Sequence, residues 1–206
     1  MQPLFRPLAS CLLAVLLLGA AAPQDSGRTV STPTGEVRVS LVKVSESGPR
    51  EGVGQGGIDA PPARVFRALM DVEHWSEFMP FMEKSSARRR KDGSIESFQR
   101  LELPFPAGRR SHRIRVRGRT ETGPTGTVWR VEWTSERGSG NVKEHRGSWT
   151  LVANGTGGTR ATLRLFTNPG GFLAASAADR GTAETLPWIF HGLRQHVRRS
   201  RYDDKL

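Results

Sequence analysis

The sequence predicts an α+β fold in which a curved antiparallel β-sheet wraps around a long C-terminal α-helix. Three observations predict this fold. Residues 83–167 form segments of alternating polar and apolar residues, separated by turns, as in antiparallel hairpins. One strand and two short helices precede these segments, and one long amphipathic helix follows them. A single amphipathic helix must bury its apolar face, and the concave side of a curved sheet offers the place.

The N-terminal part of this region begins in an extended form. Residues 22–35 are rich in Pro, Ser, Thr and Gly, which is typical of a flexible linker. Residues 36–44 alternate polar and apolar side chains, which predicts a strand. Residues 52–59 are a second extended piece, weakened by four glycines. The segment 59–62, Asp-Ala-Pro-Pro, then opens a helix, because proline suits the first helical turn.

Two short helices are expected next. The apolar residues of the first helix fall on one helical face: Val65, Phe66, Leu69 and Met70. The second helix, over residues 72–78, groups Trp75 with Phe78 and ends before Pro80, which cannot continue it.

Five strands and a helix complete the prediction. The five strands are expected at residues 94–103, 112–119, 127–134, 143–152 and 159–166. The helix covers residues 172–200, and its apolar stripe consists of Leu186, Ile189, Phe190, Leu193 and Val197. Pro187 lies inside this stripe, so the helix is expected to bend or to begin afresh there.

The first 21 residues have the pattern of a secretory signal peptide. A basic start is followed by an uncharged run of ~15 residues, shorter than the ~20 that a membrane-spanning helix needs, and the run ends in small residues. We therefore expect cleavage after Ala21, with an uncleaved anchor as the alternative. Cleavage removes Cys11, the one cysteine, and a secreted chain without disulfides is expected in a bacterial periplasm. The predicted organisation is signal peptide 1–21, linker 22–35, one ligand-binding domain 36–200 and a tail 201–206.

One segment carries a family resemblance. The chain reads Ile58-Asp59-Ala60-Pro61-Pro62, then a helix ending in Leu69-Met70-Asp71, then Trp75 with Phe78 and Pro80 at the spacing Trp-x-x-Phe-x-Pro. This segment and the element order resemble the START-like (SRPBCC) superfamily, in its polyketide cyclase and coenzyme Q-binding branch. The resemblance covers about residues 37–199. It implies a helix-grip fold whose sheet and C-terminal helix enclose an apolar cavity for a lipid, a quinone or a polyketide-like molecule.

The net charge of +11 suggests an anionic partner. Four arginines, Arg113, Arg115, Arg117 and Arg119, alternate along one predicted strand, so they share one face of the sheet. They predict either a solvated convex face with cross-strand ion pairs, or a basic surface that docks on an anionic membrane. Nucleic acid is excluded as a partner, because the aromatic residues lie mainly on the opposite register and are not interleaved with the arginines for base stacking.

The apolar register supplies the candidate ligand-binding residues. Side chains on that register face the inside of the sheet or come from the helices that cover it, and they line either a cavity or an ordinary core. The predicted lining consists of Trp75, Phe78, Phe81, Leu103, Ile114, Val116, Trp129, Val131, Trp133, Trp149, Leu163, Leu165, Leu186, Ile189 and Phe190.

No catalytic residue, metal site or cofactor is predicted. The five histidines are scattered without metal-ligand spacing. His145 shares the register of Trp149, so it is a candidate polar group in the cavity, unless it lies at an exposed strand end. Glu144 takes the opposite face unless a bulge intervenes.

The resulting hypothesis is non-catalytic binding or transport of a hydrophobic small molecule. The alternatives are a cyclase or aromatase that uses the same cavity, and a basic module on an anionic membrane. The oligomeric state stays open.

Overall fold

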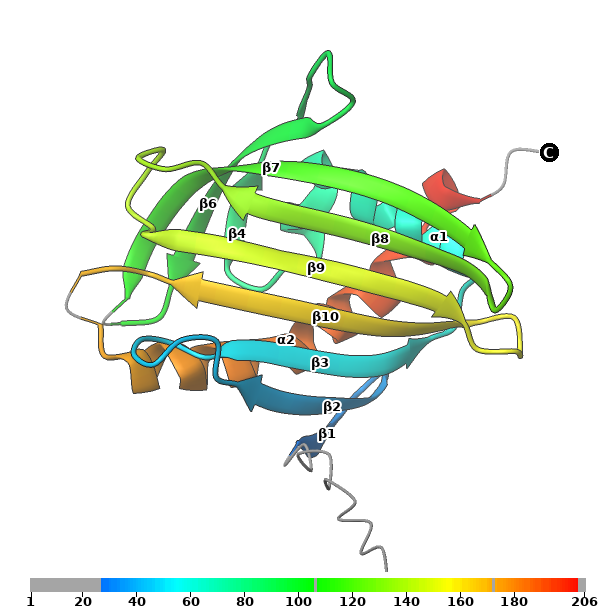
Figure 1. The fold of residues 1–206 in the computed structure, drawn as a ribbon, viewed down its shortest axis with the longest axis horizontal. Helices are drawn as coiled ribbons and strands as arrows, with labels where there is room; N and C mark the ends of the chain where they lie inside the picture. Colours follow the sequence, from blue (N-terminus) through cyan, green and yellow to red (C-terminus); the bar gives the residue numbers. More distant parts are fainter. Residues whose placement is uncertain (1–26, 106, 172, 204–206) are drawn as a thin grey trace, which may run out of the picture.

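The computed structural model describes residues 27–105, 107–171 and 173–203. Within them the chain forms ten strands, two α-helices and two 3₁₀-helices (Figure 1). The strands are β1 (Arg28–Thr32), β2 (Gly35–Val42), β3 (Glu51–Ile58), β4 (Met82–Ser85), β5 (Arg88–Arg89), β6 (Ile95–Leu103), β7 (Gly108–Gly123), β8 (Gly126–Ser135), β9 (Glu144–Ala153) and β10 (Thr159–Asn168). The helices are α1 (Pro62–Met70), η1 (Val72–Glu77), α2 (Ala175–His196) and η2 (Ser200–Tyr202). The predicted signal peptide, residues 1–21, lies outside the described residues.

All strands belong to one antiparallel sheet in the order β1-β2-β3-β10-β9-β8-β7-β6-β4, with β5 paired to β6. The sheet is curved, and both α-helices lie behind it in Figure 1, on its concave side. The long helix α2 contacts β1, β2, β3 and β10, whereas the short helix α1 contacts β7, β8 and β9. The predicted helix-grip architecture is therefore confirmed, and the two helices cover different parts of the concave face.

The alternation predicted for the central strands is also found. Along β7, Ile114 and Val116 are fully buried against the concave side, whereas Arg113 before them and Arg117 after them are exposed. The strand β3 keeps its glycines for a packing reason. A Cβ atom at Gly54 would lie 2.9 Å from the Phe190 ring, so only glycine lets α2 approach this strand so closely.

The prediction of a linker over residues 22–35 is wrong for residues 28–32. These residues form β1, which pairs with β2 as an antiparallel hairpin. The turn is made possible by Gly35, whose φ of 121° favours glycine. The composition suggested a linker, but Thr29, Val30 and Thr32 are β-branched residues that suit an edge strand.

The predicted tail is also partly structured. The helix α2 runs through Pro187 without a break and ends at His196, and residues 200–202 form η2. Tyr202 is 3% exposed, and its hydroxyl donates to Asp71 Oδ2 at 2.9 Å while it accepts from His196 Nε2 at 2.7 Å. His74 Nδ1 lies 2.8 Å from Asp71 Oδ1. We call Asp71, His74, His196 and Tyr202 the Asp71 cluster; it ties the chain end to the turn between α1 and η1.

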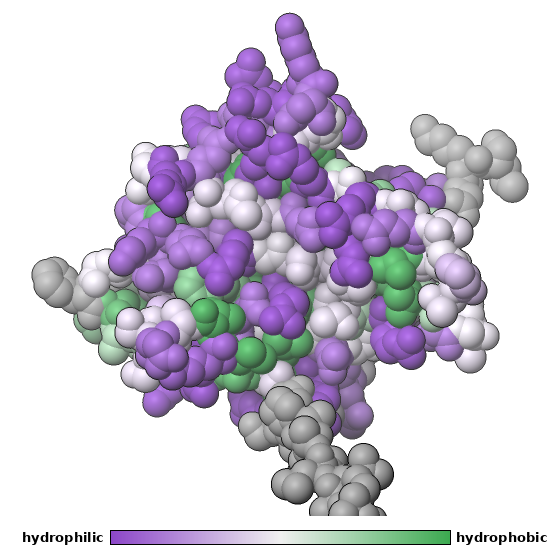
Figure 2. Space-filling model, viewed as in Figure 1, coloured by the Kyte–Doolittle hydropathy of each residue, from purple (hydrophilic) through white to green (hydrophobic). Residues whose placement is uncertain are grey.

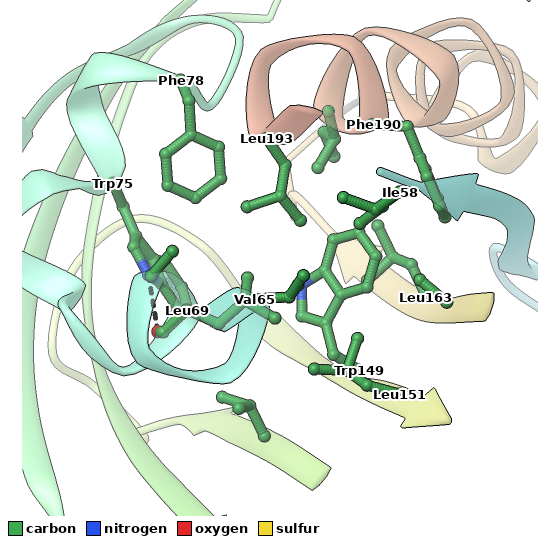
Figure 3. Close-up of a cluster of buried hydrophobic side chains, with 14 of the residues drawn as sticks. Ile58, Val65, Leu69, Trp75, Phe78, Trp149, Leu151, Leu163, Phe190 and Leu193 are labelled. Carbon is green, nitrogen blue, oxygen red and sulfur yellow. Dashed lines mark hydrogen bonds between the residues drawn. The ribbon is translucent and has the colours of Figure 1, made fainter. Parts of the chain in front are cut away.

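A packed core lies where α1, η1 and α2 meet the sheet (Figure 3). Val65 and Leu69 from α1 point toward Trp149 from β9 and Leu193 from α2. The Trp149 and Phe190 rings meet edge to face, with centroids 5.0 Å apart. Trp75 satisfies its buried indole N–H by donating to the Leu69 carbonyl at 2.9 Å. Among the described helices, none is both long enough and apolar enough to span a bilayer.

Candidate functional site

A cavity of about 900 Å³ lies beside the packed core, between the concave face of the sheet and α2. Its walls come from η1 and the residues after it, from the adjoining ends of β6, β7, β8, β9 and β10, and from α2 as far as Ile189. The loops that follow β6 and β10 lie at this end of the molecule, on the left in Figure 1. The cavity reaches the surface there, because Phe105 and Trp188 line it and are 97% and 52% exposed.

The structure brings part of the predicted lining together around this cavity. The predicted residues that line it are Trp75, Phe81, Leu103, Trp133, His145, Leu163, Leu165 and Ile189. The others do not: Phe78, Ile114, Val116, Trp129, Val131, Trp149, Leu186 and Phe190 belong to the packed core or lie against it. The helix α1 covers the concave face under β7, β8 and β9, and Leu186 and Phe190 of α2 pack against the glycines of β3.

Several lining residues were missed by the sequence analysis. They include Gln99 and Leu101 on β6, Arg110 and His112 on β7, and Trp188 on α2. Gln99 and His112 lie on the same inward register as the apolar residues of their strands. A polar residue on an apolar register is the signal that would have identified them.

His145 lies inside the cavity rather than at an exposed strand end. Trp133 Nε1 donates to His145 Nε2 at 2.9 Å, and His145 Nδ1 lies 3.0 Å from Thr167 Oγ1. Because an indole N–H can only donate, Nε2 is the acceptor and Nδ1 carries the proton that is donated to Thr167. Burial, reinforced by the neighbouring His112, lowers the pKa of His145 to about 3, so the ring is neutral at pH 7.

Glu144 is not a cavity residue. Its side chain is exposed on the outer face and pairs with Arg146. No bulge rotates it inward, because β9 keeps a regular register with β10 through this position. The prediction of Glu144 as a polar cavity group is therefore wrong.

Gln99 and His112 form the inner wall of the cavity. They face each other across β6 and β7, and they are 1% and 3% exposed. The His112 ring lies 4.9 Å from that of His145. Neither ring nitrogen of His112 has a hydrogen-bond partner, and neither does Gln99 Nε2. Burial lowers the pKa of His112 to about 4, so this imidazole is neutral as well.

The mouth of the cavity carries exposed aromatic rings. Phe81, Phe105 and Trp188 line the cavity and stand among the large hydrophobic residues that the described surface exposes. Phe81 is also the one described non-glycine residue with a positive φ, 63°. A bulky residue in this backbone region costs energy, and such strain is concentrated at functional sites. Phe81 thus places backbone strain at the cavity entrance.

The basic surface is separate from the cavity. Arg113, Arg115, Arg117 and Arg119 lie on the convex face, where hydrophilic side chains cover the upper strands (Figure 2). Each arginine lies within 4 Å of a carboxylate: these partners are Glu96 for Arg113, Glu136 for Arg115, Asp92 for Arg117, and Glu121 and Glu132 for Arg119. The arrangement matches the predicted solvated face with cross-strand ion pairs. Docking on an anionic membrane stays a prediction.

The cavity is lined mainly by apolar side chains, and the charged residues of its lining are Arg110, Arg180 and Glu184. In the part of the chain that the structure describes, no three or more histidine, cysteine, aspartate or glutamate side chains gather as they would around a metal ion. The polar groups that face the cavity deep inside it are two neutral imidazoles, a carboxamide and a threonine hydroxyl.

Comparison with known proteins gives the family. The model of the family described as polyketide cyclase/dehydrase and lipid transport matches residues 58–190. No curated protein matches the sequence.

Solved structures share the fold. One is a STAR-related lipid transfer protein (a fragment) from Xanthomonas axonopodis, with a TM-score of 0.69, 22% identity, and coverage of 85% of this chain and 100% of that one. Human StAR-related lipid transfer protein 5 has a TM-score of 0.65 and 12% identity, covering 85% and 88%. The Zhui aromatase/cyclase from Streptomyces has a TM-score of 0.50 and 15% identity, covering 74% and 97%.

These findings agree with the element order, the sheet wrapped around α2 and the segment from Ile58 to Pro80 that first suggested the resemblance. The chain therefore belongs to the polyketide cyclase/dehydrase and lipid transport family, and it has the START-like helix-grip fold.

Proposed function

We propose that this protein binds and carries a hydrophobic small molecule in its cavity, without chemistry of its own. The cavity carries the proposal: it has about 900 Å³, it is lined mostly by apolar side chains, and it opens to the surface. Cavities that bind small molecules have volumes of about 300–1,000 Å³, apolar walls and a few placed polar groups. Burial of apolar ligand surface would supply the affinity, at ~25 cal/mol for each Å² removed from water.

The ligand class follows from the cavity and the family. A lipid, a quinone or a polyketide-like molecule has the apolar surface that such a cavity buries. The likeness to the coenzyme Q-binding branch rests on the resemblance alone and stays a prediction.

The place of action is part of the proposal. We infer from residues 1–21 that the protein acts outside the cytoplasm, in a bacterial periplasm. Fractionation of the native host, with the molecular mass of the protein measured in each fraction, tests this. A periplasmic protein shortened by 21 residues is expected, and a full-length cytoplasmic one would contradict it.

The test of ligand binding uses native mass spectrometry and a matched pair of variants. The protein purified from its own host should carry an additional lipid-like mass. A Cβ atom at Gly181, which lines the cavity, meets no other atom within 4 Å, so a larger side chain has room to enter the cavity. Gly181→Trp should reduce binding of the apolar dye phenylnaphthylamine, whereas Gly181→Ala should leave it unchanged. Absence of a co-purified mass, together with no dye binding by the wild type, would contradict the proposal.

A cyclase that uses the same cavity is the second candidate. His112 and His145 favour it, because an ionisable side chain beside free space is what such an enzyme would need. However, both nitrogens of His145 are already bonded, and the lowered pKa of His112 makes it a weak base at pH 7. Conversion of a linear polyketone to a cyclic product, lost in His112→Phe, would favour the enzyme.

A further inference from the structure

The inner wall of the cavity contains buried polar atoms that nothing in the protein satisfies. These atoms are Gln99 Nε2 and both ring nitrogens of His112. A buried polar group without a partner costs about 1–3 kcal/mol, and such groups are rare in native proteins. Trp149 Nε1 is also unpaired, but it lies in the packed core, where no free space adjoins it. Gln99 and His112 differ because they line the cavity.

The hydrogen-bonding capacity of this pair is defined. The carboxamide nitrogen of Gln99 is a donor, and a neutral imidazole offers one N–H donor and one acceptor nitrogen. His145, the neighbouring ring, cannot satisfy His112, since its own nitrogens are engaged by Trp133 and Thr167. The Nε2–H group of Gln99 and the ring N–H of His112 therefore lie on adjacent strands, and neither donor is bonded to an acceptor in the protein.

The position of the pair within the cavity is also defined. On β6 the lining residues are Gln99, Leu101 and Leu103, and on β7 they are Arg110 and His112. Leu103 adjoins the loop at the mouth, so Gln99 lies roughly 13 Å farther along the strand, at about 3.3 Å per residue. Gln99 and His112 are the innermost lining residues of their strands, and Leu101 and Leu103 lie between them and the mouth.

We propose that Gln99 and His112 form a polar subsite that binds an uncharged oxygen, carbonyl or hydroxyl, at the inner end of the hydrophobic ligand. This inference rests on the proposed function and specifies its ligand. A carbonyl oxygen has two lone pairs and accepts from both donors at once; a hydroxyl accepts from one donor and donates to the free imidazole nitrogen. A carboxylate suits the subsite less well than an uncharged oxygen, because Gln99 and His112 themselves carry no charge that would offset its desolvation. The nearest inward cation on β7, Arg110, lies one register step toward the mouth.

The test compares ligands of equal chain length that differ in the oxygen. The assay measures how well each compound displaces phenylnaphthylamine; the compounds are dodecane, decyl methyl ketone, dodecanol and dodecanoate. It is carried out on the wild type, on Gln99→Met and His112→Phe, and on the control Leu165→Met. The control changes an apolar cavity residue and conserves its volume. We expect Gln99→Met and His112→Phe to lower the affinity for the ketone about tenfold relative to the affinity for dodecane, which is the effect of losing one hydrogen bond. Leu165→Met should affect ketone and dodecane equally.

The outcomes separate the two proposals. If both the ketone-to-dodecane and the dodecanol-to-dodecane affinity ratios are unchanged in both subsite variants, the subsite is overturned and the carrier function is left intact. Failure of every compound to displace the dye from the wild type overturns both. If the variants bind dodecanol tenfold more weakly but bind the ketone as before, the subsite binds a hydroxyl. If they bind the ketone tenfold more weakly but bind dodecanol as before, the subsite binds a carbonyl. Selective weakening of dodecanoate alone contradicts the uncharged subsite.

A measurement on the wild-type protein removes any dependence on variant folding. The infrared carbonyl stretch of bound decyl methyl ketone should lie at lower frequency than in liquid dodecane, because a hydrogen-bonded carbonyl is weakened. A bound carbonyl with the frequency seen in dodecane would overturn the subsite.

Discussion

The two ends of the concave face differ in how they are filled. At the end where α1 crosses β7, β8 and β9, Val65, Leu69 and Trp149 are buried completely and the space between helix and sheet is closed. At the end near the loops after β6 and β10, the short helix η1 is the helix that contacts β6, and a cavity of about 900 Å³ remains. The same alternating strand pattern thus forms one wall of a packed core at one end and one wall of a cavity at the other.

The polar groups differ in the same way. In the packed end, the Asp71 cluster satisfies Tyr202 and Asp71 by mutual hydrogen bonds. In the hollow end, Gln99 and His112 are left with unsatisfied atoms although they are almost fully buried. Trp149 Nε1 and His196 Nδ1 in the packed end lack a hydrogen-bond partner as well, but these residues do not line the cavity, so the atoms of Gln99 and His112 are the ones that a bound ligand would satisfy. In this molecule, the candidate ligand site is the place where unpaired polar atoms adjoin free space.

The largest expected effect contrasts one tryptophan from each end. Trp149→Ala should lower the free energy of unfolding by ~3–5 kcal/mol, because it leaves a cavity in a closed core. Trp188→Ala, which removes a half-exposed ring at the mouth, should cost about 1 kcal/mol or less. Urea unfolding monitored by circular dichroism measures both. Equal losses would show that the two ends are packed alike.

Acid should destabilise the protein through the histidines of the hollow end. The pKa values of His112 and His145 are lowered to about 4 and about 3, whereas in the unfolded chain they titrate near 6.5. Between these values the unfolded chain binds more protons. The stability contribution is therefore complete above pH 6.5 and is lost as the pH falls below it.

We expect these two imidazoles to contribute a loss on the order of 5 kcal/mol between pH 7 and pH 4.5, about 2.5 kcal/mol from each, measured by urea unfolding at each pH. His112→Phe should reduce this loss. A profile that is flat over this range, or that rises toward acid, would contradict the buried neutral imidazoles.

Two glycines of α2 sharpen the comparison within a single helix. A Cβ atom at Gly192 would lie 2.3 Å from the Phe78 carbonyl oxygen in the packed end, whereas at Gly181 it meets nothing within 4 Å. Gly192→Ala should cost about 1–3 kcal/mol through this backbone clash. Gly181→Ala should stabilise the protein by up to about 1 kcal/mol, because alanine favours the helix. Thermal unfolding of the two variants checks the opposite signs, and a gain in both would remove the distinction.

The smallest effect is expected on the outer face. Arg115 pairs with Glu136 at 2.9 Å at a partly exposed site, and such pairs contribute about 0.2–1 kcal/mol. Arg115→Gln should therefore change the free energy of unfolding by less than about 1 kcal/mol and leave phenylnaphthylamine binding unchanged. Strongly salt-sensitive binding to anionic vesicles that is lost when Arg113, Arg115 and Arg117 are all neutralised would favour the membrane-docking alternative instead.

The fold could be predicted because its signals are periodic. Ile114 and Val116 alternate with arginines, and Leu186, Ile189 and Leu193 repeat at helical spacing, so both faces were identified from the sequence. The strand β1 was not predicted, because its five residues lie among loop-forming residues and become a strand only by pairing with β2.

The site was predicted in part, because periodicity shows which way a side chain points but not how far along a strand a covering helix reaches. Trp149 and Leu165 both point inward, yet α1 closes the space at Trp149 and not at Leu165. Gln99 shares its inward register with Ser97, and His112 shares its register with Arg110, so these polar residues give only a weak signal in the sequence. Their lack of partners is a three-dimensional property that the sequence does not contain.

The most direct test of a hollow end that binds a hydrophobic ligand is methyl nuclear magnetic resonance of the wild-type protein during titration with decyl methyl ketone. The account predicts shifts of Leu101, Leu165 and Ile189, which line the cavity, and unchanged methyl signals for Leu69 and Leu151 in the packed end. Saturable shifts confined to the first group would locate the ligand in the cavity. Shifts in both groups, or in neither, would contradict the account.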